Sequence, residues 1–189
     1  MENFNYQDKH ILFVCTGNTC RSAMAEAFLK DALKQEDIPE LKGIKVVSCG
    51  TDAEYGCCPS IFAIDAMAEA DIDIRKHRSQ PFSEDLVKNS LAIFALDQVH
   101  LSKIENRYGA VMPEDSYLIT HWKTINPHHG ISDPWGKTFQ FYQECRNKIA
   151  DTIPSILFFL RMKFLLKETE LNTENSQFYK PYCKKVPLI

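Results

Sequence analysis

The segment from His10 to Lys30, HILFVCTGNTCRSAMAEAFLK, constrains the fold of this chain more than any other part of the sequence. An apolar run stops at Cys15, and a turn of small and polar residues leads to Arg21, where a new pattern begins. Apolar side chains there recur at the spacing of one helix face. They are Ala25, Phe28, Leu29, Ala32 and Leu33. The segment therefore predicts a buried strand, a loop, and a helix that packs against the sheet.

The alternation of strand and helix continues along the chain. Short apolar runs predict four strands, at Ile11–Val14, Ile44–Val47, Leu91–Ala95 and Ser116–Ile119. A second helical pattern follows Pro59, a residue type favoured in the first turn of a helix. Its apolar positions are Ala63, Ala66, Met67 and Ala70. Strands that alternate with helices in this way indicate right-handed βαβ units. We therefore expect an α/β fold, doubly wound, with a four-stranded parallel sheet and helices on both faces.

The C-terminal part predicts a long helix after Asp133, with apolar positions at 141, 145, 149 and 153. Pro154 should kink or restart this helix, because proline has no backbone N–H to donate. The stretch Ser155–Leu166 is strongly apolar, but it is too short for a membrane span and contains two basic residues. A membrane surface or a partner could cover it; we favour a closing helix laid on the sheet. We assign residues 1–167 to one domain and residues 168–189 to a flexible C-terminal extension.

Composition excludes several classes of function. The 189 residues are 44% hydrophobic and 25% charged, as in an ordinary soluble globular protein, and suffice for one domain with a sizeable core. The net charge of −3 gives no basic field, so we expect neither nucleic-acid binding nor adhesion to acidic membranes. The polar N-terminal residues 1–9 contain no signal peptide, and we expect no integral membrane segment.

The seven cysteines indicate reduced thiols and a cytoplasmic location. Their number is odd, and they form no CxxC pair and no pattern with zinc-site spacing. His128 and His129 have no acidic or cysteine partner at ligand spacing, so we interpret them as part of a solvated loop. We expect neither a metal nor a cofactor.

The loop after the first strand carries the chemistry. Ligands bind at the carboxyl ends of parallel strands, and a helix N-terminus offers unpaired N–H groups and a positive partial charge. Gly17 and Asn18 tolerate unusual backbone angles, so the loop can form an anion-binding nest. No Lys-Ser/Thr follows the glycine at the spacing of a Walker-type phosphate loop. Instead, the loop places a cysteine before an arginine.

Cys15, Arg21 and Ser22 predict a nucleophile within a phosphate site. A nest and a helix terminus favour the thiolate, so we expect a depressed pKa for Cys15. The guanidinium of Arg21 can take two oxygens of a tetrahedral dianion. Ser22 could donate a hydrogen bond to the thiolate and make it a better leaving group. Nucleophile and oxyanion clamp would then surround one volume of the size of a phosphorus atom.

The sequence VCTGNTCRSAMAEA resembles the phosphate-binding loop of low-molecular-weight protein tyrosine phosphatases, V-C-x-G-N-x-C-R-S-P-x-A-E-A. Downstream segments are similar to further motifs of that family, in the same order. They are VVSCGT (46–51), KHRS (76–79), IFALD (93–97) and SDPWG (132–136). The resemblance covers about residues 9 to 165. It implies the fold expected above and a phosphatase that needs no cofactor and acts on a phosphorylated protein.

The resemblance also implies a role for individual residues. Cys15 would be the nucleophile that forms a cysteinyl-phosphate, Arg21 would bind the phosphoryl oxygens, and Asp133 would be the general acid and then the base. The phosphate-binding loop would consist of Thr16, Gly17, Asn18, Thr19, Cys20, Arg21 and Ser22. The residues that hold this loop in shape would be Asn18, Ser22, Ser48 and His77. Cys20 could pair with the nucleophile in a reversible oxidative lock, or be a small loop residue only.

Two positions bear on the substrate. Eukaryotic members of the family usually have a bulky aliphatic residue in place of Thr19 and two tyrosines after the Asp-Pro, whereas this chain has Trp135 and a glycine there. These features are similar to those of bacterial protein arginine phosphatases of the same fold. A short hydroxyl side chain gives a guanidinium room and a polar contact, and Trp135 could form a wall against either substrate. We therefore favour phosphoarginine over phosphotyrosine.

Other functions are less well supported. Arsenate reductases linked to thioredoxin begin with a very similar loop, but they need two further cysteines after the third strand, and residues 95–110 contain none. A non-catalytic module that binds phosphorylated residues predicts loss of Cys15, Arg21 or Asp133, and all three are present. The sequence leaves the oligomeric state open.

Overall fold

The computed structural model describes residues 9–123 and 129–171. One sheet forms the centre of the fold, with the order β2-β1-β3-β4 and every neighbouring pair parallel. Its strands are β1 (His10–Cys15), β2 (Lys45–Gly50), β3 (Ser90–Ala95) and β4 (Ser116–Leu118). All four predicted strands are present, so the predicted four-stranded parallel sheet is confirmed.

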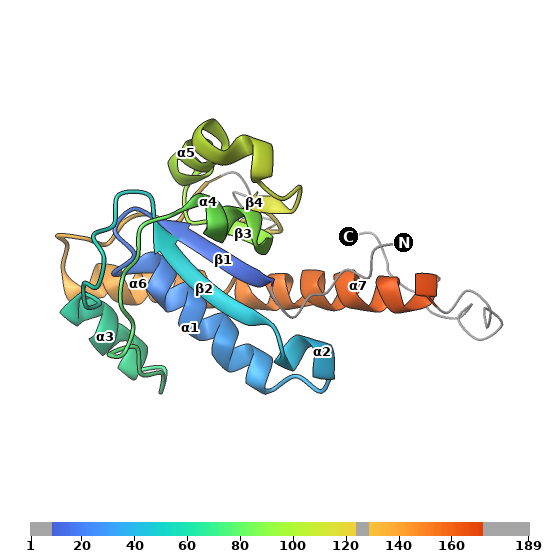
Figure 1. The fold of residues 1–189 in the computed structure, drawn as a ribbon. Helices are drawn as coiled ribbons and strands as arrows, with labels where there is room; N and C mark the ends of the chain where they lie inside the picture. The colour runs from blue at the N-terminus through green and yellow to red at the C-terminus, as the bar shows by residue number, and fades with distance from the viewer. Residues whose placement is uncertain (1–8, 124–128, 172–189) are drawn as a thin grey trace.

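Helices cover both faces of the sheet (Figure 1). One face carries α1 (Arg21–Lys34), α2 (Pro39–Lys42), α3 (Ile61–Ala68), α6 (Phe139–Ala150) and α7 (Ile153–Leu171). The other face carries α4 (Glu84–Lys88) and α5 (Gln98–Tyr108), which continues into the 3₁₀ turn η2 (Gly109–Val111). Helix α3 begins after Ser60, whose side chain accepts from the Ala63 N–H, and so beyond Pro59, the helix start that the sequence predicts.

Strand β1 separates two apolar cores. Ile11 and Phe13 pack in the core that includes α1, α6 and α7, whereas Leu12 and Val14 pack in the core under α4 and α5. Successive side chains of a strand point to opposite faces, and all six residues of β1 are buried. A central strand that is apolar on both faces is typical of parallel sheets with helices on both sides. The predicted doubly wound arrangement is therefore confirmed.

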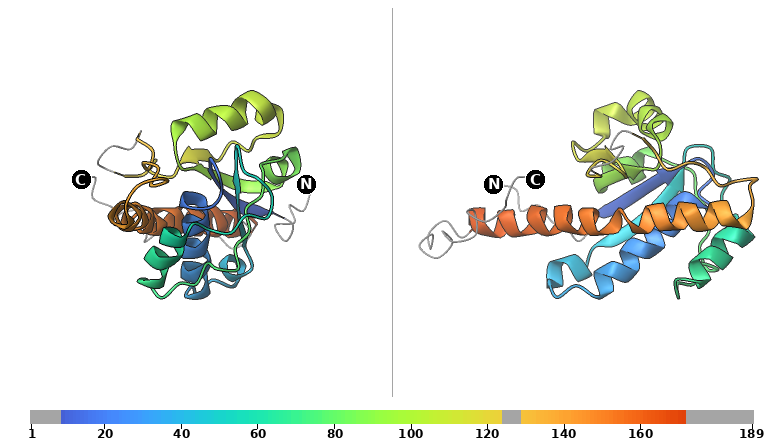
Figure 2. Two further views of the ribbon diagram at one scale, coloured as in Figure 1. Left: turned by 90° about the vertical axis from the view of Figure 1, so that its left-hand side faces the viewer. Right: turned by 180° about the vertical axis from the view of Figure 1, so that it is seen from behind.

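The C-terminal helical pattern is divided where Pro154 predicts it. Helix α6 ends at Ala150 and α7 begins at Ile153, which places the proline in the first turn of α7, where its missing N–H costs nothing. Phe159 packs edge-on against Phe94 of β3, so α7 does lie on the sheet as expected. Beyond this contact α7 continues past the edge of the sheet (Figures 1 and 2).

The predicted domain boundary at residue 167 falls inside α7, which runs to Leu171. Residues 172–189 lie outside the described residues, so the flexible C-terminal extension stays a prediction. Within the described ranges, none of the helices combines the length and the apolar character that crossing a bilayer requires.

Candidate active site

The loop between β1 and α1 lies at the carboxyl end of the central strand. Asn18 has a φ of 54°, in the left-handed region that asparagine tolerates, as expected. Gly17 has no such angle, and a Cβ atom there would make only an ordinary contact, 3.6 Å from Thr19 Oγ1. The predicted need for unusual backbone angles thus applies to Asn18 and not to Gly17.

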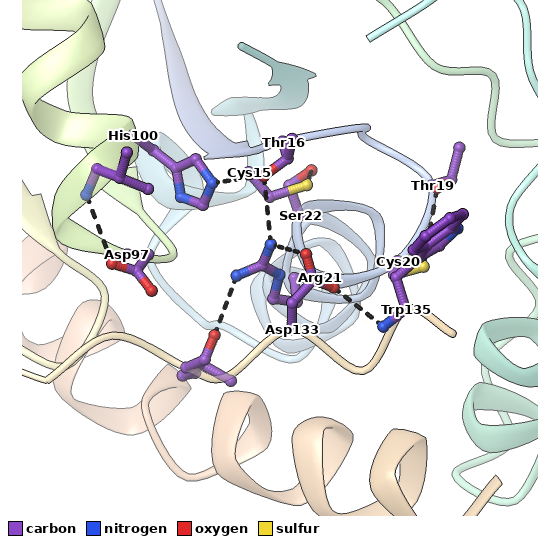
Figure 3. A network of polar contacts seen from close by, with 12 residues as sticks. Cys15, Thr16, Thr19, Cys20, Arg21, Ser22, Asp97, His100, Asp133 and Trp135 are labelled. Carbon is purple, nitrogen blue, oxygen red and sulfur yellow. Dashed lines mark hydrogen bonds and ion pairs between the residues drawn. The ribbon is translucent and has the colours of Figure 1, made fainter. Parts of the chain in front are cut away.

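A cavity of about 200 Å³ opens at this loop. The acid loop, residues 131–136, forms its opposite wall (Figure 3). Its lining residues are Cys15, Thr16, Gly17, Thr19, Cys20, Arg21, Asp133 and Trp135. The structure therefore brings the three predicted catalytic residues and both predicted wall residues to one cavity.

The thiol of Cys15 lies at the base of the cavity with 2% of the residue exposed. Its Sγ is 3.0 Å from Ser22 Oγ and accepts from the Asn18 N–H at 3.3 Å. Ser22 Oγ itself accepts from Asn18 Nδ2, so its own hydrogen can be donated either to the sulfur or to the Cys49 carbonyl, which is 3.4 Å away. The contact expected between Ser22 and the thiol is therefore present.

The expected depression of the Cys15 pKa is wrong for this structure. Burial raises the pKa of the thiol above its ordinary value, against the opposing effects of the Ser22 and Asn18 hydrogen bonds and the Arg21 charge. The physical reason is that a buried thiolate loses its hydration, while the neighbouring guanidinium is already paired with a carboxylate. An unpaired Arg21 would favour the thiolate more strongly.

Arg21 is held between the loop and the acid loop. Its Nη2 donates to Asp133 Oδ2 and to Thr16 Oγ1 (3.4 Å), and its Nη1 donates to the Ile131 carbonyl at 3.1 Å. The side chain of Arg21 is 4% exposed, whereas that of Asp133 is 44% exposed and also accepts from the Trp135 N–H. The carboxylate of Asp133 thus pairs with the guanidinium across the cavity that both residues line.

Asn18 is the hub of a polar network behind the loop. Its Nδ2 donates to Ser22 Oγ at 2.8 Å and to Ser48 Oγ at 2.7 Å, and its carbonyl accepts from His77 Nε2 at 2.8 Å. These four are the residues predicted to hold the loop in shape, and the structure links all of them. Their supporting role stays a prediction.

The model of the family described as "Low molecular weight phosphotyrosine protein phosphatase" matches residues 10–174, which include the loop, the network and the acid loop. The chain belongs to this family. It is therefore a phosphatase, a hydrolase, and the predicted resemblance is confirmed.

Three proteins show which kinds of enzyme this phosphatase is similar to. It is 29% identical to a protein-arginine-phosphatase of Bacillus subtilis (76% of this chain and 91% of the relative), and 35% identical to an arsenate reductase of Staphylococcus aureus (75% and 90%). Its structure is similar to the YwlE arginine phosphatase of Geobacillus stearothermophilus, with a TM-score of 0.72 and 27% identity over 83% of this chain and 96% of that one.

Sequence reasoning about this phosphatase missed three residues that complete the network. Glu26 accepts from Ser48 Oγ and lies 3.7 Å from His77 Nδ1. Gln80 donates its N–H to Asn18 Oδ1 and its side-chain amide to the Ser48 carbonyl, both at 2.9 Å. His100 contacts the loop from α5, through Thr16. Glu26 lies inside the quoted motif, but no pattern in the sequence identifies the other two.

Cys20 lines the cavity with Cys15, and both are free thiols. The Sγ atom of Cys20 lies 3.2 Å from Ser60 Oγ and 3.7 Å from Tyr142 Oη. The N-cap residue of α3 and one residue of α6 therefore contact this second sulfur. An oxidative lock between the two cysteines stays a prediction.

A larger cavity of about 370 Å³ lies behind the loop, between α1, β2 and residues 73–80. Glu26 and His77 line it, but the nucleophile and the acid loop do not. Among the described residues no group of histidines, cysteines and carboxylates could hold a metal ion, and His128 lies outside them. The expected absence of a metal stays a prediction.

Proposed function

We propose that this chain is a cysteine-dependent protein phosphatase that acts on phosphoarginine through a cysteinyl-phosphate. The observation that carries the proposal is the single cavity shared by Cys15, Arg21, Asp133 and Thr19. Nucleophile, oxyanion clamp, acid and specificity residue then surround the same phosphoryl group.

In the first step the Cys15 thiolate attacks phosphorus, the S–P bond forms, and the P–N bond to the substrate guanidine breaks. Asp133 gives its proton to the leaving nitrogen. Arg21 and the loop N–H groups hold the three phosphoryl oxygens while charge builds on them. The Arg21–Asp133 pair must separate first, which frees the guanidinium for phosphate and the carboxyl for proton transfer.

In the second step a water molecule attacks the cysteinyl-phosphate. Asp133 accepts its proton, the O–P bond forms and the S–P bond breaks, which releases inorganic phosphate and the Cys15 thiolate. The Ser22 hydroxyl, 3.0 Å from the sulfur, stabilises the departing thiolate. Such a nucleophile must be reduced, so we also propose a cytoplasmic location.

The preference for phosphoarginine rests on Thr19 and on relatives. The short polar side chain of Thr19 lines the cavity together with Trp135, which is 74% exposed at its mouth. A guanidinium gains from a hydroxyl contact, whereas a phenyl ring gains more from an aliphatic wall. The similarity to arginine phosphatases supports this choice, although the identity to an arsenate reductase is somewhat higher.

Two alternatives remain within the family, hydrolysis of phosphotyrosine and reduction of arsenate. Arsenate reduction requires two further cysteines that relay the disulfide from the nucleophile to the protein surface, and residues 95–110 contain none. The non-catalytic binding module has no support, because Cys15, Arg21 and Asp133 are all in place.

Finally, we propose that peroxide oxidises Cys15 to a sulfenic acid and that Cys20 displaces water from it, which gives a protective disulfide.

The deciding experiment compares kcat/KM for phosphoarginine and phosphotyrosine peptides between wild type and Thr19→Ile. We expect wild type to prefer phosphoarginine, and Thr19→Ile to reverse the ratio by about tenfold or more. Thr138→Ile is the matched control, because Thr138 is exposed and does not line the cavity. Reduction of arsenate is measured in parallel, with thioredoxin, thioredoxin reductase and NADPH as the source of electrons.

The outcomes are distinct. Preference for phosphotyrosine by wild type, unchanged in Thr19→Ile, would show that the arginine assignment is wrong. Turnover of arsenate faster than of either peptide would identify a reductase instead. Activity retained in Cys15→Ser would contradict the cysteinyl-phosphate mechanism itself.

A further inference from the structure

His100 is a buried histidine at the site to which neither the sequence patterns nor the mechanism above gives a role. It lies in the first turn of α5, whose N-cap is Asp97, and only 1% of it is exposed. Its Nε2 is 2.9 Å from Thr16 Oγ1 (Figure 3). Within the described ranges, His100 Nδ1 is the one buried side-chain nitrogen or oxygen atom without a hydrogen-bond partner. A buried imidazole that makes its single side-chain contact to the phosphate-binding loop invites a functional explanation.

The hydroxyl of Thr16 connects this histidine to the oxyanion clamp. Thr16 Oγ1 accepts from Arg21 Nη2, so its own hydrogen is free to be donated to His100 Nε2. Such a donation requires an unprotonated Nε2, which means a neutral ring. The line of contacts then runs from His100 through Thr16 to Arg21.

The surroundings keep the ring neutral. Burial, followed by the positive charge of Arg21, lowers the pKa of His100 to about 4. Asp97 and Asp133 act in the opposite direction, and Lys103 adds slightly to the lowering. A protonated ring at this position could no longer accept the hydrogen of the Thr16 hydroxyl, and it would repel the guanidinium.

We infer that neutral His100 is a positioning residue, which acts through the Thr16 hydroxyl to hold the Arg21 guanidinium in place for the phosphoryl group. The inference rests on the oxyanion role proposed for Arg21. It matters most when Asp133 leaves the guanidinium to act as an acid. At that stage Thr16 and the Ile131 carbonyl are the remaining side-chain and backbone anchors of the arginine.

The test is a double-mutant cycle between the two ends of this hydrogen bond. The single variants are His100→Leu and Thr16→Val, which delete one partner each, and the third is the double variant. Thr16 is exposed, so Thr16→Val tests the contact even if His100→Leu folds poorly. His100→Gln is the rescue variant, because its side-chain amide reaches the position of Nε2 without a titratable group.

Two readouts are needed. Hydrolysis of p-nitrophenyl phosphate gives KM and kcat, and the shift in melting temperature with inorganic phosphate gives affinity without turnover. We expect about fivefold weaker phosphate binding in each single variant, no further loss in the double variant, and near wild-type binding in His100→Gln. Urea unfolding of each variant separates this effect from lost stability.

Additive losses in the double variant, or a His100→Gln variant as weak as His100→Leu, would overturn the inference. If wild type turns over no phosphate ester while the variants still show the coupled loss of phosphate binding, the proposed function is overturned and the role of His100 is supported.

Discussion

Gly50 lies so close to the phosphate-binding loop that a Cβ atom there would be 2.3 Å from the carbonyl oxygen of Thr16. The same atom would be 3.0 Å from the Asn18 nitrogen. Because both neighbours are backbone atoms, they cannot move aside unless the whole loop moves with them. The glycine at the end of β2 is required for space and not for an unusual backbone angle. It allows β2 and the loop to pack directly on each other.

The first prediction concerns Gly50→Ala. The added methyl group must push the loop away from β2, and a displacement of about 1 Å at an active site can cost about 100-fold in rate. We expect a loss of this size in kcat/KM for p-nitrophenyl phosphate, with weaker inhibition by inorganic phosphate. Gly109→Ala is the control, because its Cβ would lie 3.9 Å from the nearest atom, Glu105 Cγ. Equal activity of the two variants would contradict this prediction.

The second prediction concerns Asp133→Asn. Loss of the proton donor should lower kcat by about 100-fold or more. The variant also removes the negative charge that pairs with Arg21, so inorganic phosphate should inhibit it more strongly than it inhibits wild type. Steady-state kinetics with phosphate as inhibitor measure both effects. The control is Asp151→Asn, an exposed carboxylate paired with Lys123. Weaker phosphate inhibition in Asp133→Asn would mean that the ion pair does not compete with substrate.

The strands and the loop could be predicted from sequence because their signals are local. The apolar run before Cys15 and the stripe on α1 follow the periods of a strand and a helix. Helices α2 and α4 are too short to show a helical period, and no prediction placed them. The network behind the loop joins residues from β2 and the turn at His77, far apart in sequence. Ser48 and His77 were identified only through the family resemblance.

The electrostatics of the site could not be read from the sequence. The raised pKa of Cys15 depends on how completely the thiol is buried and on the pairing of Arg21 with a carboxylate more than 100 positions away. His100 likewise reaches Thr16 from α5, 84 positions further along the chain. Such contacts follow from the tertiary structure, in which the carboxyl ends of the strands meet at one edge.

The third prediction concerns stability and pH. Burial lowers the pKa of His100 to about 4 and also lowers that of His10, so below about pH 6.5 both residues bind fewer protons in the folded chain than in the unfolded chain. The unfolded state then holds more protons between these values, so stability falls as the pH drops from about 6.5 towards 4. We expect His100→Gln to lose less stability than wild type between pH 7 and 5 in urea unfolding. His129→Gln, at an exposed position, is the control, and identical slopes for wild type and His100→Gln would contradict the argument.

The fourth prediction concerns the attachment of α7. Arg161 donates to both oxygens of the buried Glu36 carboxylate, at 3.0 and 2.7 Å, and so ties α7 to the end of α1. Arg161→Gln leaves that carboxylate without its charged partner. We expect a loss of about 1 kcal/mol in the free energy of unfolding, a modest value because Arg161 is half exposed to solvent.

Two further variants separate a buried charge from a surface ion pair. Arg75→Gln removes a similar two-point contact to the exposed Asp73, and we expect little change in stability. Glu36→Gln combined with Arg161→Gln should recover part of the loss, because the double variant no longer buries an unpaired carboxylate. Urea unfolding at fixed salt measures all three. If Arg161→Gln is as stable as wild type, the ion pair does not anchor α7, and the helix is held by its other contacts, among them the apolar contacts of Ile156 and Leu160.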